Sequence, residues 1–373
     1  MAESTRLVDL IQLRIDEFLS EQSGQLATIA EELTELTDIA RGFLAGGKRF
    51  RALFCYWGWQ SAAGVTSGFD PLPTDEASAD LDAVVMAATA LELFHAAALV
   101  HDDIMDNSDT RRGAPAAHRL FERHHIADGW TGNPTAFGES AALLLGDLLL
   151  GWSDELFDRG TSMLADRAAG VAGRAEFIRM RTEVTAGQYL DILEENSWTT
   201  YPESTALARA HRVIVYKSAK YSVEAPLTIG AALGGASLAQ LAALRSFGLP
   251  LGVAYQLRDD LLGVFGDPEV TGKPAGDDLR EGKRTVLIAL ARTRLPASSR
   301  NLMDELLGDP GLDSQQVDMI RTALRDCGAI EEVEKIIEHN VGLAVAALKD
   351  APIAPSARAQ LLQLADTVTR RSA

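Results

Sequence analysis

Apolar residues recur at helical spacing along almost the whole chain, and this periodicity constrains the fold more than any other feature. Side chains at i, i+3, i+4 and i+7 share one face of an α-helix, so each such run predicts a helix with one buried face. Alternating runs of strand length are essentially missing. The sequence therefore predicts an all-α protein. The predicted helices cover residues 7–19, 29–44, 53–59, 81–105, 141–156, 175–193, 206–229, 238–264, 286–291, 317–324, 333–348 and 357–368.

Three segments rich in Gly, Pro, Asp and Thr interrupt the helical pattern, at residues 62–80, 127–140 and 266–283. The pattern keeps the same character on both sides of each segment. We therefore expect one helical bundle domain spanning residues 1–373, with a surface insertion near 62–80 and a helical C-terminal tail over 284–373.

Charge and cysteine content limit the possible partners and the compartment. The 373 residues carry a net charge of −18, which disfavours nucleic acid and anionic membranes unless basic residues gather locally. Cys55 and Cys327 lie far apart without metal-type spacing, so we expect a reducing, cytoplasmic setting. The most apolar stretch contains Glu92 and His95, and we expect neither a signal peptide nor a membrane span.

The first acidic cluster closes the predicted helix 81–105. Asp102, Asp103 and Asp106 are spaced i, i+1 and i+4, which places the first and last on one helix face. The three like charges repel one another, and they lie at a helix C-terminus, where the macrodipole disfavours anions. A positive group should compensate them.

The second acidic cluster closes the predicted helix 238–264 with Asp259 and Asp260, and Gly263 stands where the first cluster has its last aspartate. Carboxylates in such clusters suit Mg²⁺, which also binds substrate phosphates. One such motif is more often a solvated helix end. Two motifs at the ends of apolar helices, each followed by basic residues, favour metal sites that could hold several ions around one diphosphate.

Basic residues are gathered beside Gly or Asp motifs in this acidic chain. Arg can grip phosphate oxygens bidentately and Lys acts as a point charge, so these clusters indicate a phosphorylated substrate. Lys220 is equally well explained as an ordinary surface residue. The clusters are Lys48, Arg49 and Arg51; Arg111 and Arg112; Lys217 and Lys220; and Lys273 and Lys283.

The motifs G-G-K-R-F-R, D-D-I-M-D-N-S-D-T-R-R-G, G-Q-Y-L-D, Y-K-S, Q-L-R-D-D-L-L-G-V-F-G-D and G-K-P-A-G-D-D-L occur in this order. Together they resemble the trans-isoprenyl diphosphate synthase (polyprenyl synthetase) family, from about Gly46 to Lys283. The resemblance implies an all-α fold around a central cavity, Mg²⁺ dependence, and head-to-tail addition of isopentenyl diphosphate to an allylic diphosphate. It also implies a homodimer.

The resemblance assigns roles by position. It implies about three Mg²⁺ ions: two on Asp102 and Asp106, with Asp103 in support, and a third on Asp259 and Asp260, with Asp278 as outer carboxylate. The isopentenyl diphosphate pocket would comprise Lys48, Arg51, His95 and Arg112, and the allylic diphosphate would meet Arg111, Lys217 and Lys273. Gln188, Asp191 and Gln256 would line the reacting carbons, with Asp191 also a metal ligand, and Ser218 and Lys283 complete the substrate-binding set.

Two positions depart from the fullest family pattern. Gly263 replaces the last aspartate of the second motif, and Ser218 stands where Thr commonly follows the lysine. Two carboxylates remain for one metal, and Ser keeps the hydroxyl that Thr would supply. We therefore expect an active enzyme.

The helix before the first motif bears on product length. A growing chain should run past Ala98 and Ala97 and then meet Phe94, by i−4 and i−8 geometry. In the family, bulky aromatics at the two alanine positions stop elongation at C15. Here we expect C20 geranylgeranyl diphosphate, with Phe94 as floor. Farnesyl diphosphate, or chains of C25 or longer, stay open because Leu144 or Tyr189 could also shape the tunnel.

Three functions of other classes are weighed. A class I terpene cyclase also uses D-D-x-x-D with Mg²⁺, but it lacks the second-substrate pocket that G-G-K-R-F-R and R-R-G suggest. A non-catalytic partner subunit would be expected to have lost the aspartates that this chain retains. A generic divalent-cation binder would need no phosphate-gripping clusters.

Overall fold

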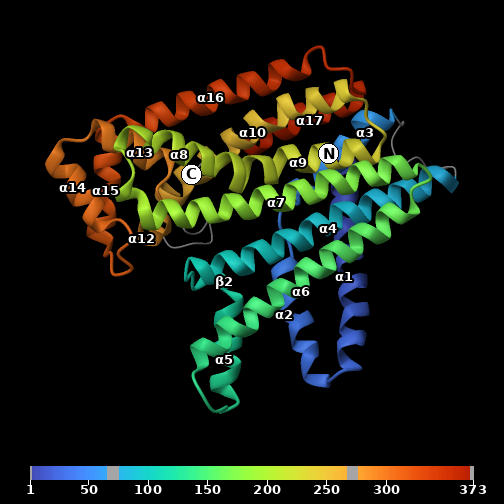
Figure 1. Cartoon of the computed structure of the whole chain (residues 1–373), viewed down its shortest axis with the longest axis horizontal. Coiled ribbons are helices and arrows are strands. Elements are labelled where there is room, and N and C mark those ends of the chain that lie inside the picture. The colour runs from blue at the N-terminus through green and yellow to red at the C-terminus, as the bar shows by residue number, and fades with distance from the viewer. Residues whose placement is uncertain (1, 65–74, 267–275, 370–373) are drawn as a thin grey trace. The chain divides into compact units, whose positions relative to one another are not determined.

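The computed structural model describes residues 2–64, 75–266 and 276–369, and these ranges are helical apart from short connections (Figure 1). The predicted all-α class is confirmed. In the part of the chain that is described, the strands are limited to β1 and β2, two residues each, paired antiparallel. This small hairpin follows the first aspartate motif.

The elements follow one another along the chain as bundle helices joined by short turns. The first half comprises α1 (Ala2–Ala27), η1 (Glu31–Leu33), α2 (Thr34–Leu44), α3 (Phe50–Ala63), α4 (Asp75–Met105), β1 (Thr110–Arg111), β2 (Ala114–Pro115), α5 (Ala117–Ala127), α6 (Pro134–Met163) and α7 (Arg167–Ser197). The second comprises η2 (Trp198–Thr200), η3 (Glu203–Thr205), α8 (Ala206–Val213), η4 (Ile214–Glu224), α9 (Ala225–Leu233), α10 (Leu238–Phe265), α12 (Asp277–Glu281), α13 (Val286–Arg294), α14 (Ala297–Leu306), α15 (Ser314–Asp326), α16 (Ala329–Leu348) and α17 (Pro355–Thr369).

Every predicted helix is present, and the differences lie at the boundaries. The prediction of loop over 127–140 is wrong from residue 134, because Asn133 caps α6 by accepting hydrogen bonds from the Thr135 and Ala136 amides, with Pro134 at the first helical position. Residues 75–80 and 277–281 are also helical rather than loop. The predicted insertion and third loop otherwise fall largely on residues 65–74 and 267–275, outside the described residues. Helix α14 was missed.

Contacts divide the chain into two compact units, each drawn from distant parts of the sequence. The first comprises Met1–Glu176, Pro226–Leu238 and Ile353–Ala357. The second comprises Phe177–Ala225, Ala239–Pro352 and Arg358–Ala373. The single domain expected from the sequence stays a prediction.

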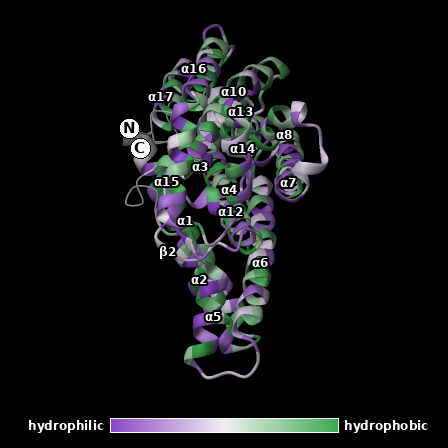
Figure 2. Cartoon of the chain, turned by 90° about the vertical axis from the view of Figure 1, so that its left-hand side faces the viewer, coloured by the Kyte–Doolittle hydropathy of each residue, from purple (hydrophilic) through white to green (hydrophobic). Residues whose placement is uncertain are grey.

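The core of the first unit is built on α4, which packs along α6. The Ser153 hydroxyl on α6 donates a 2.7 Å hydrogen bond to the Ala90 carbonyl on α4. Hydrophilic and hydrophobic residues alternate along α5 and α6, as in amphipathic helices (Figure 2). Helices α3 and α9 approach closely, since a Cβ at Gly58 would lie 2.2 Å from the Leu227 carbonyl oxygen. This contact requires glycine.

Helix α4 is apolar enough to resemble a membrane span by composition alone. An 18-residue window within Asp80–Met105 has a mean hydropathy of 1.9, and 78% of that window is buried inside the protein. Burial at this level is typical of the core helix of a soluble bundle, and such a helix passes the same test of length and composition. The sequence of α4 is therefore explained by its place in the core.

The second unit has its own apolar core. Buried residues of α10, α13, α15 and α16 form one continuous cluster that includes Leu257, Leu287, Ile320 and Val333. Arg258 on α10 binds Glu334 on α16 with two hydrogen bonds of 2.6 and 2.7 Å. This unit therefore holds the end of α10, where the second aspartate motif lies, on a packed support.

Candidate active site

The first aspartate motif lies where α4 ends, and the chain there folds back on itself. The Asp106 amide still donates a helical hydrogen bond of 2.8 Å to the Asp102 carbonyl, and the Ser108 amide donates to the Asp103 carbonyl. Arg112 and Gly113 then form the two-residue turn between β1 and β2, with φ of 53° and 77°. Two successive positive φ values are typical of a type I′ hairpin turn, which explains the glycine after R-R.

The hairpin returns Arg111 to the aspartates. Its Nε donates a 2.8 Å hydrogen bond to Asp103 Oδ1, and Nη2 also contacts that oxygen. Nη2 lies 3.6 Å from Asp102 Oδ2. The Asp103 side chain is fully buried, whereas that of Asp102 is 17% exposed. Arg111 is thus the positive group that the acidic cluster requires, and Asp103 supports the cluster through Arg111.

His95 lies about two turns before Asp102 on α4, among the basic residues expected around it. Burial lowers the pKa of His95 well below its usual range, and the charges of Arg51, Arg112, Arg111 and Arg49 lower it further. The imidazole is therefore neutral near pH 7. The structure brings these predicted residues of the isopentenyl diphosphate pocket together within the first unit.

The G-G-K-R-F-R segment supplies both a backbone approach and an exposed cation. The Arg112 guanidinium lies against Gly47, 3.5 Å from where a Cβ would stand. Gly47 has a φ of +89°, which favours glycine. Lys48 is exposed and Arg51 is partly buried. The loop thus presents Lys48 toward solvent and lies beside the Arg112 guanidinium of the hairpin turn.

Arg49 anchors the G-G-K-R-F-R loop, a role that the sequence did not indicate. Its side chain is 3% exposed and its Nη1 donates a 3.0 Å hydrogen bond to Glu92 Oε2, itself on a side chain 5% exposed. Nη2 donates to Gln12 Oε1 at 2.7 Å and also to the Leu44 carbonyl. Glu92 precedes His95 by three residues on α4. A single acidic residue within the apolar stretch 84–100 was the available signal.

The residues predicted to set chain length lie along α4. Phe94 is 4% exposed, Ala97 is fully buried and Ala98 is partly buried. Leu144 and Tyr189 are 60% and 65% exposed. The helix therefore places Ala98 one turn before Asp102, and Phe94 one turn before Ala98.

In the second unit, Lys217 and Asp191 form a pair. Lys217 Nζ lies 2.5 Å from Asp191 Oδ2. Lys217 and Ser218 lie in η4, a π-helix, which packs so closely on α7 that a Cβ at Gly187 would stand 2.3 Å from the Lys217 amide nitrogen. π-Helical segments are frequent at functional sites. Gln188, beside that glycine, is partly buried.

The second aspartate motif ends α10 in a more buried setting. Asp260 is 6% exposed and accepts a 2.8 Å hydrogen bond from Gln256 Nε2. Burial raises the pKa of Asp260 to about 8; the Gln256 hydrogen bond opposes this, and the charges of Asp278 and Asp259 add to it. The carboxylates Asp259, Asp260 and Asp278 therefore form one interacting group.

Gly263 makes room for Asp278. A Cβ at position 263 would lie 1.9 Å from Asp278 Oδ2. Lys283 Nζ lies 3.9 Å from Asp278 Oδ1 and 2.5 Å from Glu281 Oε2. The absent aspartate of the second motif is thus replaced in space by the Asp278 carboxylate. Lys273, also predicted to bind substrate, lies outside the described residues.

The donor set fits a hard divalent cation. The candidate ligands offer oxygen atoms. Burial, and after it the charges of Asp278 and Asp259, raise the pKa of Asp260, and a bound cation would relieve both costs as a proton does. Among described residues, no group of three or more His, Cys, Asp and Glu side chains is arranged to hold a metal. Mg²⁺ usually binds through one or two carboxylates, water and substrate phosphates, so such a group is not required.

Residues 33–326 match the family described as polyprenyl synthetase. The chain belongs to this family. It is similar to the crystal structure of a geranylgeranyl pyrophosphate synthase from Corynebacterium glutamicum complexed with isoprenyl diphosphate and magnesium, with 38% identity, a TM-score of 0.89, and coverage of 98% of this chain and 99% of that one.

Two further relatives bear on the product. The chain is 29% identical to the geranylgeranyl diphosphate synthase of Mycobacterium tuberculosis, over 93% of this chain and 87% of the relative. It is also 29% identical to the geranylfarnesyl diphosphate synthase of Aeropyrum pernix, over 86% and 88%. This polyprenyl synthetase is therefore a prenyltransferase, a trans-prenyl diphosphate synthase with the isoprenoid synthase fold.

Proposed function

We propose that this synthase condenses isopentenyl diphosphate with dimethylallyl, geranyl and farnesyl diphosphates, and that its main product is all-trans geranylgeranyl diphosphate. The observation that carries the chain length is the order of side chains on α4: Ala97 and Ala98 near the first motif, and Phe94 one turn deeper. Geranylgeranyl diphosphate synthases among the relatives support the same product.

The two substrates would be held by separate basic groups. Lys48, Arg51 and Arg112, with neutral His95 as a hydrogen-bonding group, suit the diphosphate of isopentenyl diphosphate. Arg111, Lys217 and Lys273 suit the allylic diphosphate, with Ser218 and Lys283 beside it. Gln188, Asp191 and Gln256 would face the reacting carbons.

The carboxylates that would hold about three Mg²⁺ ions are Asp102 and Asp106 in the first motif and Asp259, Asp260 and Asp278 in the second, with Asp191 as a further ligand. The Corynebacterium relative is complexed with magnesium and isoprenyl diphosphate, which supports this assignment. When bound, the metal ions supply positive charge that stabilises the departing diphosphate.

The reaction requires charge separation more than a dedicated base. The allylic C–O bond breaks, the diphosphate leaves with the electron pair, and the double bond of isopentenyl diphosphate attacks the allylic cation to form a C–C bond. The proton lost in forming the new double bond goes most simply to the departing diphosphate. Arg and Lys side chains favour the transition state over the ground state, because negative charge grows on the leaving group.

The test is to incubate purified protein with isopentenyl diphosphate, Mg²⁺ and each allylic diphosphate in turn, and to size the dephosphorylated products by chromatography. We expect a C20 product, lost with Asp102→Ala, longer chains with Phe94→Ala, and a C15 product with Ala98→Phe. Chains of C25 or more from the unaltered protein would refute Phe94 as the floor, and they would favour a geranylfarnesyl-type synthase, as in the Aeropyrum relative.

We further propose that the enzyme works as a homodimer in the cytoplasm. The exposed apolar residues Leu143 and Leu144 on α6 and Ile178 on α7 support association, because each leaves a large side chain in solvent in the single chain. Light scattering on the purified protein tests the dimer: a mass of one chain, 40.1 kDa, at micromolar concentration would reject it.

A further inference from the structure

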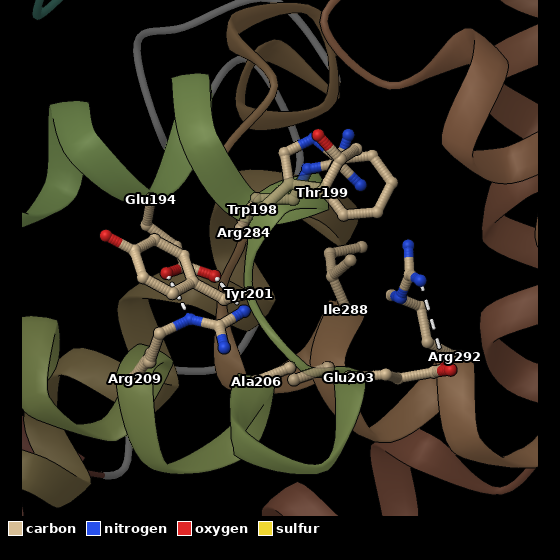
Figure 3. A pocket seen from close by; sticks show the side chains of 11 residues that line it. Glu194, Trp198, Thr199, Tyr201, Glu203, Ala206, Arg209, Arg284, Ile288 and Arg292 are labelled. Carbon is tan, nitrogen blue, oxygen red and sulfur yellow. Dashed lines mark hydrogen bonds and ion pairs between the residues drawn. The ribbon is translucent and has the colours of Figure 1, made fainter.

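A cavity of about 220 Å³ lies in the second unit, and its lining includes none of the residues assigned to the reaction (Figure 3). Its walls come from the end of α7, the connection through η2 and η3, the start of α8, and α13 with Arg284 two residues before it. Three of its side chains are arginines, in a chain with a net charge of −18. The local chemistry therefore differs from that of the whole protein.

One arginine of the cavity, Arg209, is held by hydrogen bonds to neighbouring residues. Arg209 donates to both oxygens of Glu194, at 2.7 and 3.0 Å, and its guanidinium lies 5.1 Å from the centre of the Tyr201 ring. It also binds the Pro202 carbonyl at 3.2 Å. These bonds hold the connection between α7 and α8 in place and leave Arg209 electrically balanced (Figure 3).

The other two arginines have fewer hydrogen-bond acceptors than N–H donors. Arg284 and Arg292 share a single carboxylate oxygen, Asp304 Oδ1, which lies 3.1 Å from Arg284 Nη1 and in contact with Arg292 Nη1. Both guanidiniums stack over Trp198, at 3.8 and 4.5 Å from the ring centre. Arg284 is 9% exposed, and its buried Nε has no hydrogen-bond partner among the described residues.

The charge around these two arginines does not balance. Glu203 Oε1 lies 3.8 Å from Arg292 Nη2, beyond hydrogen-bond reach, and 3.2 Å from Arg300 Nη1. Together with the paired Arg209 and Glu194, four guanidiniums thus face three carboxylates. Burial lowers the pKa of Arg284, and Asp304 opposes this by its charge and its hydrogen bond. The charge of Arg292 lowers this pKa further, and that of Glu194 raises it. A buried guanidinium with unused donors calls for a further anion.

We propose that this cavity is a second anion site, which binds a phosphoryl group between Arg284 and Arg292. Guanidinium forks match phosphate oxygens bidentately, and Trp198 fixes the planes of both forks by stacking. The cavity volume is far above the about 10–15 Å³ that a single water requires. Inorganic phosphate fits within it, and the phosphate of a phosphomonoester would fill it from the open side.

The proposal is independent of product length and of the metal assignment. It concerns residues that hold neither predicted substrate. Its location still matters to the enzyme, because Glu194 follows Asp191 by three residues on α7 and Arg284 directly follows Lys283. An anion bound to Arg284 would contact the same segments of the second unit that carry Asp191 and Lys283.

The experiment is a titration of the full chain with sodium phosphate, at constant ionic strength and with EDTA present so that metal-dependent binding is removed. Calorimetry gives the affinity, and tryptophan emission reports on the site, with Trp198→Phe identifying the source of the signal. We expect saturable binding with Kd below about 1 mM. Failure to saturate by about 20 mM would overturn the proposal.

Three variants locate the site. Arg292→Gln should weaken phosphate binding by about tenfold or more, because it removes one fork. Arg212→Gln, which removes the same charge from an exposed position on α8, should leave it within about twofold. Asp304→Asn should tighten binding by about threefold or more, because it frees both guanidiniums from a competing carboxylate. A merely structural cluster would not gain affinity in this way.

Three ligands distinguish the possible sources of the phosphoryl group. Inorganic phosphate, inorganic diphosphate and adenosine monophosphate are titrated against the unaltered protein and Arg292→Gln. Preference for adenosine monophosphate indicates a phosphomonoester, and preference for either inorganic ion indicates a free anion. Binding of all three that is unchanged in both Arg292→Gln and Asp304→Asn would place the anion elsewhere and refute the site. Circular dichroism confirms that each variant is folded.

Discussion

Any side chain at position 263, including the aspartate of the fullest family motif, should weaken the enzyme. Gly263→Ala is the smallest change that tests this. A Cβ at position 263 would lie 1.9 Å from Asp278 Oδ2, whereas ordinary van der Waals contact begins near 3.4 Å. The oxygen must therefore retreat by about 1.5 Å. Metal–oxygen distances tolerate only about 0.2 Å, so this displacement would remove Asp278 from any role at the second metal site.

The expected effect falls on metal use, with little on stability. Ala is favoured over Gly in a helix by about 1 kcal/mol, and forcing a short side chain off its rotamer costs about the same. We therefore expect the melting temperature of Gly263→Ala to stay within about 2 °C of the parent value. The Mg²⁺ concentration for half-maximal activity should rise by about tenfold, as is common when a supporting carboxylate is lost.

A double-mutant cycle isolates the cause. Asp278→Ala should raise the Mg²⁺ requirement by a similar factor, and the double variant should equal either single variant, because both remove the same carboxylate. Gly342→Ala, at a helical glycine of α16 with open space around it, is the matched control and should leave the Mg²⁺ requirement unchanged. A Mg²⁺ requirement unchanged in Gly263→Ala, or one that multiplies in the double variant, would refute the reasoning.

Three further outcomes are expected. Glu92→Gln leaves the buried Arg49 charge poorly paired, so it should lower the free energy of unfolding by about 3 kcal/mol in denaturant and raise KM for isopentenyl diphosphate. Loss of stability with an unchanged KM would show that Arg49 does not position the G-G-K-R-F-R loop for substrate. Gly146→Ala should lower kcat, because a Cβ there would lie 2.1 Å from Nε2 of His101, next to the first motif; unaltered kinetics would contradict this. Burial raises the pKa of the Cys55 thiol to about 12, so a disulfide reagent at pH 8 should modify no more than one thiol per folded chain and both after unfolding.

The helices and motifs could be predicted because their signals are local. A helical face repeats within a few residues, so α4, α6, α10 and the others were evident from periodicity. Their ends depended on capping, as at Asn133, and boundaries were accordingly less accurate. The charge on Asp102 and Asp103 required a positive partner, and Arg111 supplies it because the R-R-G turn closes a hairpin only a few residues long.

Contacts between distant residues could not be read in the same way. Arg49 looked like one basic residue among several in its cluster, yet it is buried against Glu92, 43 residues away. Gly263 looked like a missing ligand, yet it is the space that Asp278 occupies. Each depends on which helices meet, and the sequence pattern of one helix holds no information about the face of another.

The sequence by itself determined the all-α class, the two aspartate motifs and the basic clusters, and with them the family and its chemistry. Only the tertiary structure decided which charged side chains pair with one another. Arg49 pairs with Glu92 and Lys217 with Asp191, and Arg284 and Arg292 share one oxygen of Asp304. The physical reason is that a charge is visible in a sequence, whereas its neutralisation depends on burial and on distances between segments that only packing sets.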